Sequence, residues 1–367
     1  MARKLASDKI LFITLVALSL FGCVMIYSAS AVSAGEMSGN PYRYLVKQIA
    51  ALVLGGIAAF AVYRTDYRIF AKPWIVYGAY GVTLALAVFT LFRPAINGAK
   101  RWIALGPMQL QPAELLKVAL VLLLAHQLAR KSEKAGDPER ALLPSVVFAG
   151  VAAGVVVLQP DLGTAVCYVM LCAVLLWLSG ARGRWFAFGA LAMIPVLAAL
   201  LLTADYRRAR ILAFLHPEAD PLGRGFQAIQ SLIAVGAGGW CGNGLGGSRQ
   251  KLFFLPFPHT DFIFAIGGEE LGFIGALAVV VGFGLVAWRG LRAARRAPDA
   301  FASFLAAGAT AMIVVQAAIN LSVVLALVPT KGIPLPFVSY GGSSLIASWI
   351  AGGLILNISQ HEVPEGG

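Results

Sequence analysis

Of the 367 residues, 59% are hydrophobic and only 13% are charged, with a formal net charge of +12 at pH 7. Soluble globular chains carry about 25% charged residues, so this composition excludes that class and indicates an integral membrane protein. The basic residues stand in short patches between apolar runs, which argues against a nucleic-acid partner.

The apolar runs predict one all-α polytopic membrane domain over residues 1–367. About 20 apolar residues cross the hydrocarbon core, and backbone groups in lipid must be hydrogen-bonded internally, so each span should be a helix. The first run, of about 18 residues, is too long for the apolar part of a signal peptide, and we expect it to be retained. The ten predicted spans are 10–32, 46–63, 73–92, 112–130, 143–158, 162–179, 185–203, 262–288, 301–327 and 341–358.

Basic residues predict the orientation of these spans. The loops that contain MARK, YRTDYRIFAK, ARKSEKAGDPER, SGARGRW and WRGLRAARR hold about 16 Lys and Arg, against about 12 in nearly twice the length of loop on the other side. Cytoplasmic loops are enriched in Lys and Arg. We therefore expect the first set to be cytoplasmic and, with ten spans, both termini to be cytoplasmic.

A large outer loop, residues 204–260, is predicted between the seventh and eighth spans. Within it, GFQAIQSLIAV places Phe226, Ile229, Leu232 and Ile233 on one helical face, which predicts a short amphipathic helix at the membrane interface. The run GAGGWCGNGLGG that follows is too rich in glycine for a helix interior. We interpret it as a flexible or closely packed turn.

Glu114 and Lys117 are ionisable residues near the start of a predicted span. They are three residues apart, so they share a helix face and can pair. A helix start explains an acid beside Pro112, but it does not explain a lysine one turn deeper. The two readings are a polar cavity lined by this pair and a purely structural ion pair.

Asp161 in QPDLGTA and Asp261 in HTDFIF also lie at predicted helix starts on the outer side. Each can be a structural residue of a first helical turn, with Thr260 as a reasonable N-cap before Asp261. Alternatively, partial desolvation at the lip of the membrane raises the pKa of Asp261 and makes it a general base. His259 shares a face with Asp261 only if the two lie in a loop.

Glu269 and Glu270 fall deeper in the eighth predicted span. Glu269 lies about 12 Å below Asp261 at 1.5 Å per residue, and Glu270 points roughly opposite to Asp261. We expect the two glutamates to face different surroundings and to fix the helix through polar partners.

The segment PLPFVSYGGSS before the last span predicts irregular backbone that lines a cavity.

Basic residues accompany the carboxylates on the predicted outer side. Scattered basic residues usually contact solvent or lipid headgroups. Beside carboxylates, they also suit a substrate that bears phosphate or pyrophosphate. The basic residues are Arg101, Arg207, Arg208, Arg210 and Lys331.

Five motifs in one order resemble the SEDS family (shape, elongation, division and sporulation proteins): NGAKRWI, QPAELLK, QPDLGT, HTDFIFAIGGEELG and PTKGIPLPFVSYGGSS. The resemblance covers nearly the whole chain. PTKG and GNGLGGSRQKLFFLP look more like the division member FtsW than the elongation member RodA. The chain departs from the family pattern in FPHTD, which lacks the acid before the histidine, and in the small residues Gly267 and Gly268.

The resemblance implies an inverting peptidoglycan glycosyltransferase of the bacterial cytoplasmic membrane, at the division septum. It would polymerise lipid II at the outer face, beside a class B penicillin-binding protein transpeptidase and other divisome membrane proteins. The family's essential aspartate maps onto Asp261. The expected substrate-binding residues are Arg101, Glu114, Lys117, Asp161, Arg207, Arg210, His259, Lys331 and Ser339.

No cofactor is assigned by the sequence. Cationic side chains such as Arg101 and Arg210, or a divalent cation (Mg²⁺ or Mn²⁺), would stabilise a leaving pyrophosphate. Two alternatives to the enzyme stay open at this point. One is a lipid II flippase, which broken helices and buried charges would suit. The other is a non-catalytic division scaffold that recruits a transpeptidase.

Overall fold

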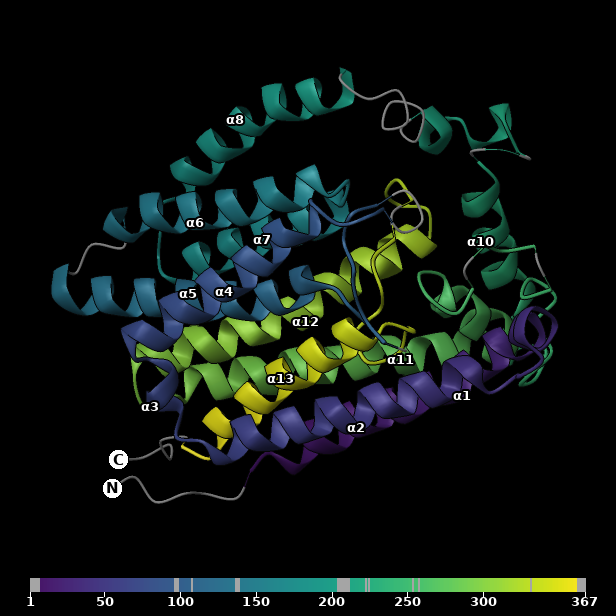
Figure 1. Cartoon of the computed structure of the whole chain (residues 1–367), viewed down its shortest axis with the longest axis horizontal. Helices are drawn as coiled ribbons and strands as arrows, with labels where there is room; N and C mark the ends of the chain where they lie inside the picture. Colours follow the sequence, from purple (N-terminus) through teal and green to yellow (C-terminus); the bar gives the residue numbers. More distant parts are fainter. Residues whose placement is uncertain are drawn as a thin grey trace.

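The computed structural model describes residues 7–95, 99–106, 108–135, 139–202, 212–221, 223, 225–252, 254–256, 258–330 and 332–361 (Figure 1). Each of the ten predicted spans is a helix, which confirms the all-α polytopic fold. The elements are α1 (Lys9–Ser38), α2 (Arg43–Arg64), α3 (Tyr67–Phe70), α4 (Pro73–Thr90), β1 (Ile103–Leu105), β2 (Met108–Leu110), α5 (Pro112–Ala135), α6 (Glu139–Leu158), α7 (Leu162–Leu178), α8 (Gly183–Leu202), the 3₁₀ helix η1 (Pro217–Ala219), α10 (Phe226–Ala237), α11 (Ile263–Arg295), α12 (Ala300–Val324) and α13 (Gly342–Ser359).

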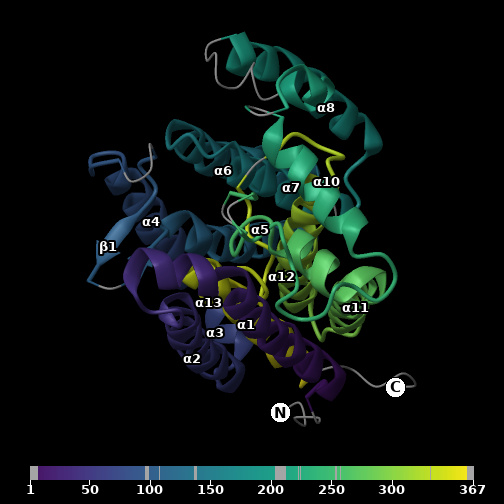
Figure 2. The same cartoon turned by 90° about the vertical axis from the view of Figure 1, so that its right-hand side faces the viewer.

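Helices α5, α12 and α13 form the centre of the bundle. Within the most apolar 18-residue window of each helix, 83% of residues are buried in α5 and α13 and 61% in α12, against 22% in α2 and α4. The outer helices therefore present most of their apolar surface to the surrounding lipid. Helix α8 lies at the edge of the bundle in both views, apart from the central helices (Figures 1 and 2).

The two ends of the bundle differ in character. The start of α1 at Lys9 and the end of α13 at Ser359, called the termini end below, lie at the same end of the bundle (Figure 1), as the even number of spans predicts. Helix α10 lies at the other end and runs across the direction of the long helices. It buries the small residues Ala228, Ser231 and Ala234, while Leu232 and Ile233 face away from the protein. The helix predicted within residues 204–260 is confirmed, and its place at the membrane interface stays a prediction.

A small β-hairpin, β1–β2, lies between α4 and α5 and was not predicted. Its strands pair antiparallel, with Ile103 opposite Leu110 and Leu105 opposite Met108. Gly106 follows the first strand with a φ of +62°, a conformation that favours glycine. Strands of three residues are too short to show the alternating pattern by which strands are predicted.

Helix α11 is broken at Gly272, where φ is +66° and ψ is −165°. The glycine-rich run 238–244 lies against this break and satisfies the freed backbone groups, as any irregular backbone at membrane depth requires. Four hydrogen bonds of 2.8–3.2 Å do so, from Asn243 N to Glu269 O, Gly244 N to Glu270 O, Phe273 N to Gly239 O and Ile274 N to Trp240 O.

The glycine-rich run is a closely packed turn, and glycine is required there by contact. A Cβ atom on Gly238 would stand 1.9 Å from the carbonyl oxygen of Gly268, and one on Gly242 would stand 2.2 Å from that of Glu270. Both distances are far inside van der Waals contact. Of the two interpretations left open for this run, the packed turn is confirmed.

Candidate functional site

The predicted pair of Glu114 and Lys117 is formed on α5, deep inside the bundle. Lys117 Nζ lies 2.8 Å from Glu114 Oε2, and the side chains are only 1% and 2% exposed. Lys117 also donates a hydrogen bond to Gln316 Oε1 of α12. A buried ion pair is tolerated when further hydrogen bonds satisfy its remaining groups, and Gln316 provides one.

Helix α12 carries two side-chain amides one turn apart, Gln316 and Asn320, and both bind the irregular segment 332–335. Gln316 Nε2 donates to Pro334 O at 2.8 Å and to Ser344 Oγ at 3.2 Å. Asn320 Nδ2 donates to Ile333 O at 2.7 Å. The polar, irregular backbone predicted before the last span is therefore held in place from α12.

Asp261 lies in a turn just before α11, next to segment 332–335. Its backbone carbonyl accepts a hydrogen bond of 2.8 Å from Asn320 Nδ2. A Cβ atom on Gly332 would stand 2.8 Å from the Asp261 carboxylate, so glycine lets this backbone approach the acid closely. Helix α11 begins at Ile263 with Phe262 as its N-cap. Of the two readings of Asp261, the structural one, with Thr260 as the N-cap and Asp261 in the first helical turn, is therefore wrong.

Asp161 joins the same end of the bundle as the N-cap of α7. Its carboxylate accepts hydrogen bonds from Thr164 N at 3.2 Å and from Thr164 Oγ1 at 3.0 Å. It also accepts one from Gln111 Nε2 at 3.3 Å and lies 3.6 Å from Arg101 Nη1. A Cβ atom on Gly163 would meet Ile333 at 2.6 Å, so the start of α7 packs against segment 332–335. Asp161 therefore serves both as a helix cap and as part of the polar cluster.

Arg101 connects the hairpin region to the turn between α6 and α7. Its Nε donates to Gln159 O at 3.2 Å and its Nη2 donates to Pro160 O at 2.9 Å. The side chain is 26% exposed, in contrast to the 4% exposed Asp161 beside it. Arg101 is thus a positive charge fixed at the rim of the polar cluster.

His259 lies in the loop with Asp261 and is held by two tyrosines. Its ring centroid is 4.4 Å from that of Tyr44 and 5.6 Å from that of Tyr340, and its carbonyl accepts a hydrogen bond of 2.9 Å from Tyr340 N. Burial lowers the pKa of His259 from the usual 6.5 to about 4. The imidazole is therefore neutral at physiological pH, which favours a packing or hydrogen-bonding role over one as a cation.

Ser339 folds the segment that it belongs to. Its hydroxyl accepts a hydrogen bond of 2.8 Å from Leu335 N, and its carbonyl accepts one of 3.2 Å from Gln48 Nε2. This buried hydroxyl is thus engaged by its own loop, and a contact with substrate stays an expectation. The expected site residues Arg207, Arg210 and Lys331 lie outside the described residues, as does the neighbouring Arg208.

Glu269 and Glu270 bind one and the same loop, residues 248–251, so the expectation that they face different surroundings is wrong. Glu269 accepts hydrogen bonds from Ser248 Oγ and from the backbone of Arg249 and Gln250. Glu270 lies 2.9 Å from Lys251 Nζ, in a buried ion pair. The loop wraps around the start of α11 and reaches both carboxylates. Their predicted role, fixing the helix through polar partners, agrees with these contacts.

Five polar residues of the cluster were not predicted as site residues. The pair Gln316 and Asn320 had a readable signal, because two side-chain amides four residues apart in an apolar span lie on one helix face. The others act through contacts distant in sequence, such as Ser343 Oγ accepting from Gln111 N at 2.8 Å. The five are Gln111, Gln316, Asn320, Ser343 and Ser344.

Together, these contacts form a polar network at the end of the bundle opposite the termini. The network joins α5, α7, α12 and the turn before α11 through segment 332–335. It contains the carboxylates of Glu114 and Asp161 and lies next to that of Asp261, which the backbone at Gly332 approaches closely. Among the described residues, no three His, Cys, Asp or Glu side chains gather as a metal site. Fold and site define a polytopic membrane protein with an ordered polar centre near one membrane face.

The chain belongs to the FtsW, RodA and SpoVE family of cell cycle proteins, whose profile matches residues 8–363. The resemblance to SEDS proteins is thereby confirmed. Stage V sporulation protein E of Bacillus subtilis (strain 168) is 41% identical over 98% of both chains. The probable peptidoglycan glycosyltransferase FtsW of Trichlorobacter lovleyi is 40% identical over 96% of this chain and 93% of its own.

Solved structures agree with this assignment. A chain of a peptidoglycan synthase complex, described for the coordination of polymerization and crosslinking, superposes with a TM-score of 0.74 at 34% identity and covers 97% of this chain and 98% of its own. The rod shape determining protein RodA of Thermus thermophilus superposes with a TM-score of 0.70 at 29% identity, over 98% of this chain and 99% of its own. The fold is therefore shared along the whole chain.

Proposed function

We propose that this protein is a peptidoglycan glycosyltransferase that polymerises lipid II at the outer face of the bacterial cytoplasmic membrane during cell division. Relatives named as probable peptidoglycan glycosyltransferases, at about 40% identity over nearly the full chain, support the activity and the division role. The observation that carries the site is Asp261, held by Asn320 in the turn just before α11. Lys and Arg are denser in the loops at the termini end, which supports cytoplasmic termini.

In the proposed reaction, the Asp261 carboxylate takes the proton from a hydroxyl of the acceptor sugar. The oxygen forms a bond to the anomeric carbon of a lipid-linked donor, the bond from that carbon to the pyrophosphate oxygen breaks, and the configuration inverts. Pyrophosphate leaves as an anion, so no second carboxylic acid has to protonate it, in contrast to a glycosidase. Arg101 supplies a fixed positive charge at the rim.

Arg207, Arg210, Lys331, His259 and Ser339 remain proposed substrate contacts, as do Glu114, Lys117 and Asp161 through the network. A divalent cation, Mg²⁺ or Mn²⁺, would supply positive charge toward the pyrophosphate in the same way as the arginines. Polymerisation with and without a chelator distinguishes the two sources of charge.

We further propose that the protein works beside a class B penicillin-binding protein transpeptidase and other divisome membrane proteins at the division septum. The similarity to a chain from a peptidoglycan synthase complex supports a crosslinking partner. The partner supplies the crosslinks that a glycan polymerase does not make.

Purified protein with its partner, supplied with lipid II in detergent, tests the proposal. Asp261→Asn and Asp261→Ala should each abolish strand formation, whereas Asp66→Asn, an N-cap of α3 at the other end of the bundle, should not. If either Asp261 variant polymerises lipid II at the wild-type rate, the assignment of Asp261 as the general base is refuted. Because no leaflets exist in detergent, strand formation by the wild-type protein refutes the pure flippase and the pure scaffold.

A further inference from the structure

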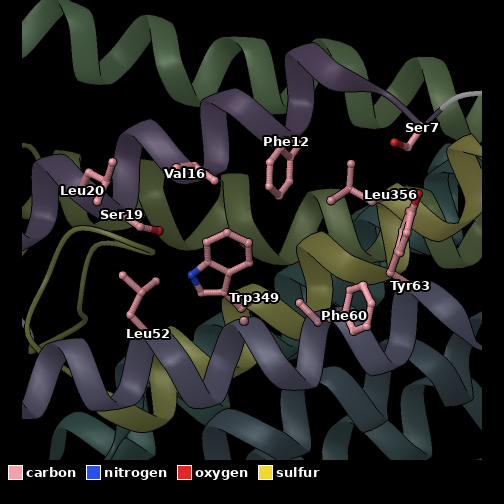
Figure 3. A pocket seen from close by; sticks show the side chains of 12 residues that line it. Ser7, Phe12, Val16, Ser19, Leu20, Leu52, Phe60, Tyr63, Trp349 and Leu356 are labelled. Carbon is pink, nitrogen blue, oxygen red and sulfur yellow. The ribbon is translucent and has the colours of Figure 1, made fainter.

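A groove with a volume of about 570 Å³ lies between α1, α2 and α13, in the half of the bundle nearest the termini (Figure 3). This volume is within the range of about 300–1,000 Å³ that small-molecule sites occupy. The site residues described above line no part of it. The lining residues on which the argument depends are Ser7, Phe12, Leu20, Gly56, Phe60 and Tyr63.

The length of the groove corresponds to one leaflet of a bilayer. Its wall on the α1 side begins at Ser7, just before the helix, and ends at Leu20. From the first residue of α1, Lys9, to Leu20 the rise is about 16 Å at 1.5 Å per residue. Half of the hydrocarbon core is about 15 Å thick. A lipid chain of the leaflet on the termini side therefore has the length to fill the groove, whereas Asp261 lies at the opposite end of the bundle.

The groove is polar at its mouth and apolar inside. Figure 3 shows the hydroxyls of Ser7 and Tyr63 at one end of it, next to Leu356. Ser19, farther in, donates its hydroxyl proton to Leu15 O at 2.9 Å and so offers no free donor. Phe12 and Phe60 are 50% and 58% exposed, so these walls open toward surrounding lipid. This layout suits one hydrocarbon chain with a polar head at the mouth.

Two basic residues lie next to groove residues. Arg64 follows Tyr63, and its guanidinium lies 5.3 Å from the ring centroid of the groove residue Phe60. The exposed Lys9 begins α1, two residues after Ser7. Arginine and lysine at this level of a membrane protein attract the phosphate of anionic lipids. These charges therefore favour a lipid with an anionic head group, in addition to the hydrocarbon chain that the groove accommodates.

Gly56 keeps the groove open. A Cβ atom placed on Gly56 would meet no atom within 4 Å, whereas one on the neighbouring Gly55 would meet Trp349 at 3.2 Å. A glycine inside a helix costs about 0.5–1 kcal/mol relative to alanine. Close packing against Trp349 explains why Gly55 is a glycine, but no such contact explains why Gly56 is one. A larger side chain at Gly56 would project into the groove.

We propose that this groove binds one acyl chain of an anionic phospholipid from the leaflet on the termini side, with the phosphate at Arg64 and Lys9. The site is separate from the substrate site, because a lipid-linked sugar that reacts at Asp261 has its chain in the other leaflet. The proposal stands apart from the proposed activity, and binding alone tests it.

The test uses the full-length protein in nanodiscs of equal phosphatidylglycerol and phosphatidylethanolamine, with retained lipid counted by native mass spectrometry after release into detergent. Gly56→Leu fills the groove, and Gly78→Leu is the matched control, because Gly78 is an exposed glycine of α4 that also has open space around it. We expect wild type and Gly78→Leu to retain about one phosphatidylglycerol each and Gly56→Leu to retain at least fivefold less.

Arg64→Gln tests the charge without filling the groove. It should lower the preference for phosphatidylglycerol over phosphatidylethanolamine about fivefold, the ratio that corresponds to the ~1 kcal/mol contributed by one basic residue near an anionic surface. Equal retention by Gly56→Leu and Gly78→Leu overturns the proposed site. Equal retention of both lipids by the wild-type protein overturns the anionic head group. Retention of an isoprenoid pyrophosphate that copurifies with the protein, in place of phosphatidylglycerol, assigns the groove to substrate and also overturns the proposal.

Discussion

Replacing Asn320 with leucine should disable catalysis without removing any proposed substrate contact. The amide group of Asn320 donates to Asp261 O at 2.8 Å and to Ile333 O at 2.7 Å, so it fixes both backbones that enclose the Asp261 carboxylate. Leucine has a similar size and no donor. Both carbonyls would lose their amide donor, which costs about 1–3 kcal/mol for each group left buried and unsatisfied.

The effect on turnover follows from geometry. A displacement of about 1 Å in a reacting group costs about 100-fold in rate. Without its anchor, the turn before α11 relaxes by such a distance, so kcat for lipid II polymerisation should fall about 100-fold. KM should change little, because Asn320 is a positioning residue that acts through Asp261. Single-turnover measurements at saturating lipid II separate these two effects.

Asn357→Leu is the matched control. Asn357 is another buried asparagine whose amide binds backbone carbonyls, those of Val62, Tyr63 and Thr65, at the termini end of the bundle. Its loss should lower the melting temperature to a similar degree while kcat per folded molecule stays at the wild-type value. The reasoning is refuted if Asn320→Leu keeps wild-type kcat, or if both variants lose activity equally.

Two further predictions concern α11 and the loop before it. Gly272→Ala should prevent the packed turn, because its Cβ atom would stand 2.4 Å from Gly242 N at a φ of +66°. Gly284→Ala in the same helix is the control, because a Cβ atom there has open space. Limited proteolysis should cut only the Gly272 variant faster than wild type, and equal cutting of both variants would contradict the packed break. The pKa of His259 is about 4 in the folded protein, against 6.5 for a free histidine. Between these pH values the unfolded chain therefore binds more protons than the folded one. Up to about 3 kcal/mol of folding stability is present above pH 6.5 and is lost as the pH falls toward 4. The melting temperature should therefore drop less between pH 7.5 and 5 in His259→Phe than in wild type, and identical drops would show that His259 does not titrate in this window.

The helices were predictable because their cause is local. Apolar length alone requires a helix in lipid, and each of the ten predicted spans is one. Asp261 was proposed as the base from sequence alone, through its place next to a predicted span and through the HTDFIF motif, and this role stays a prediction. The surroundings of Asp261 could not be predicted. The N-cap of α11 is Phe262 and not Thr260, because tertiary contacts hold the preceding turn, and a possible side-chain cap in the sequence is then a weak sign of where the helix begins.

The class of protein, the number of spans and the carboxylates that lie in or next to apolar spans could be read from the sequence, since all of these depend on composition and spacing along the chain. The partners of these carboxylates became visible with the packed helices. Glu269 and Glu270 point differently on an ideal helix, yet one loop reaches both, and Asn320 meets Asp261 across 59 positions of sequence. Hydrogen bonds between distant segments depend on how the helices pack, and no local pattern records that arrangement.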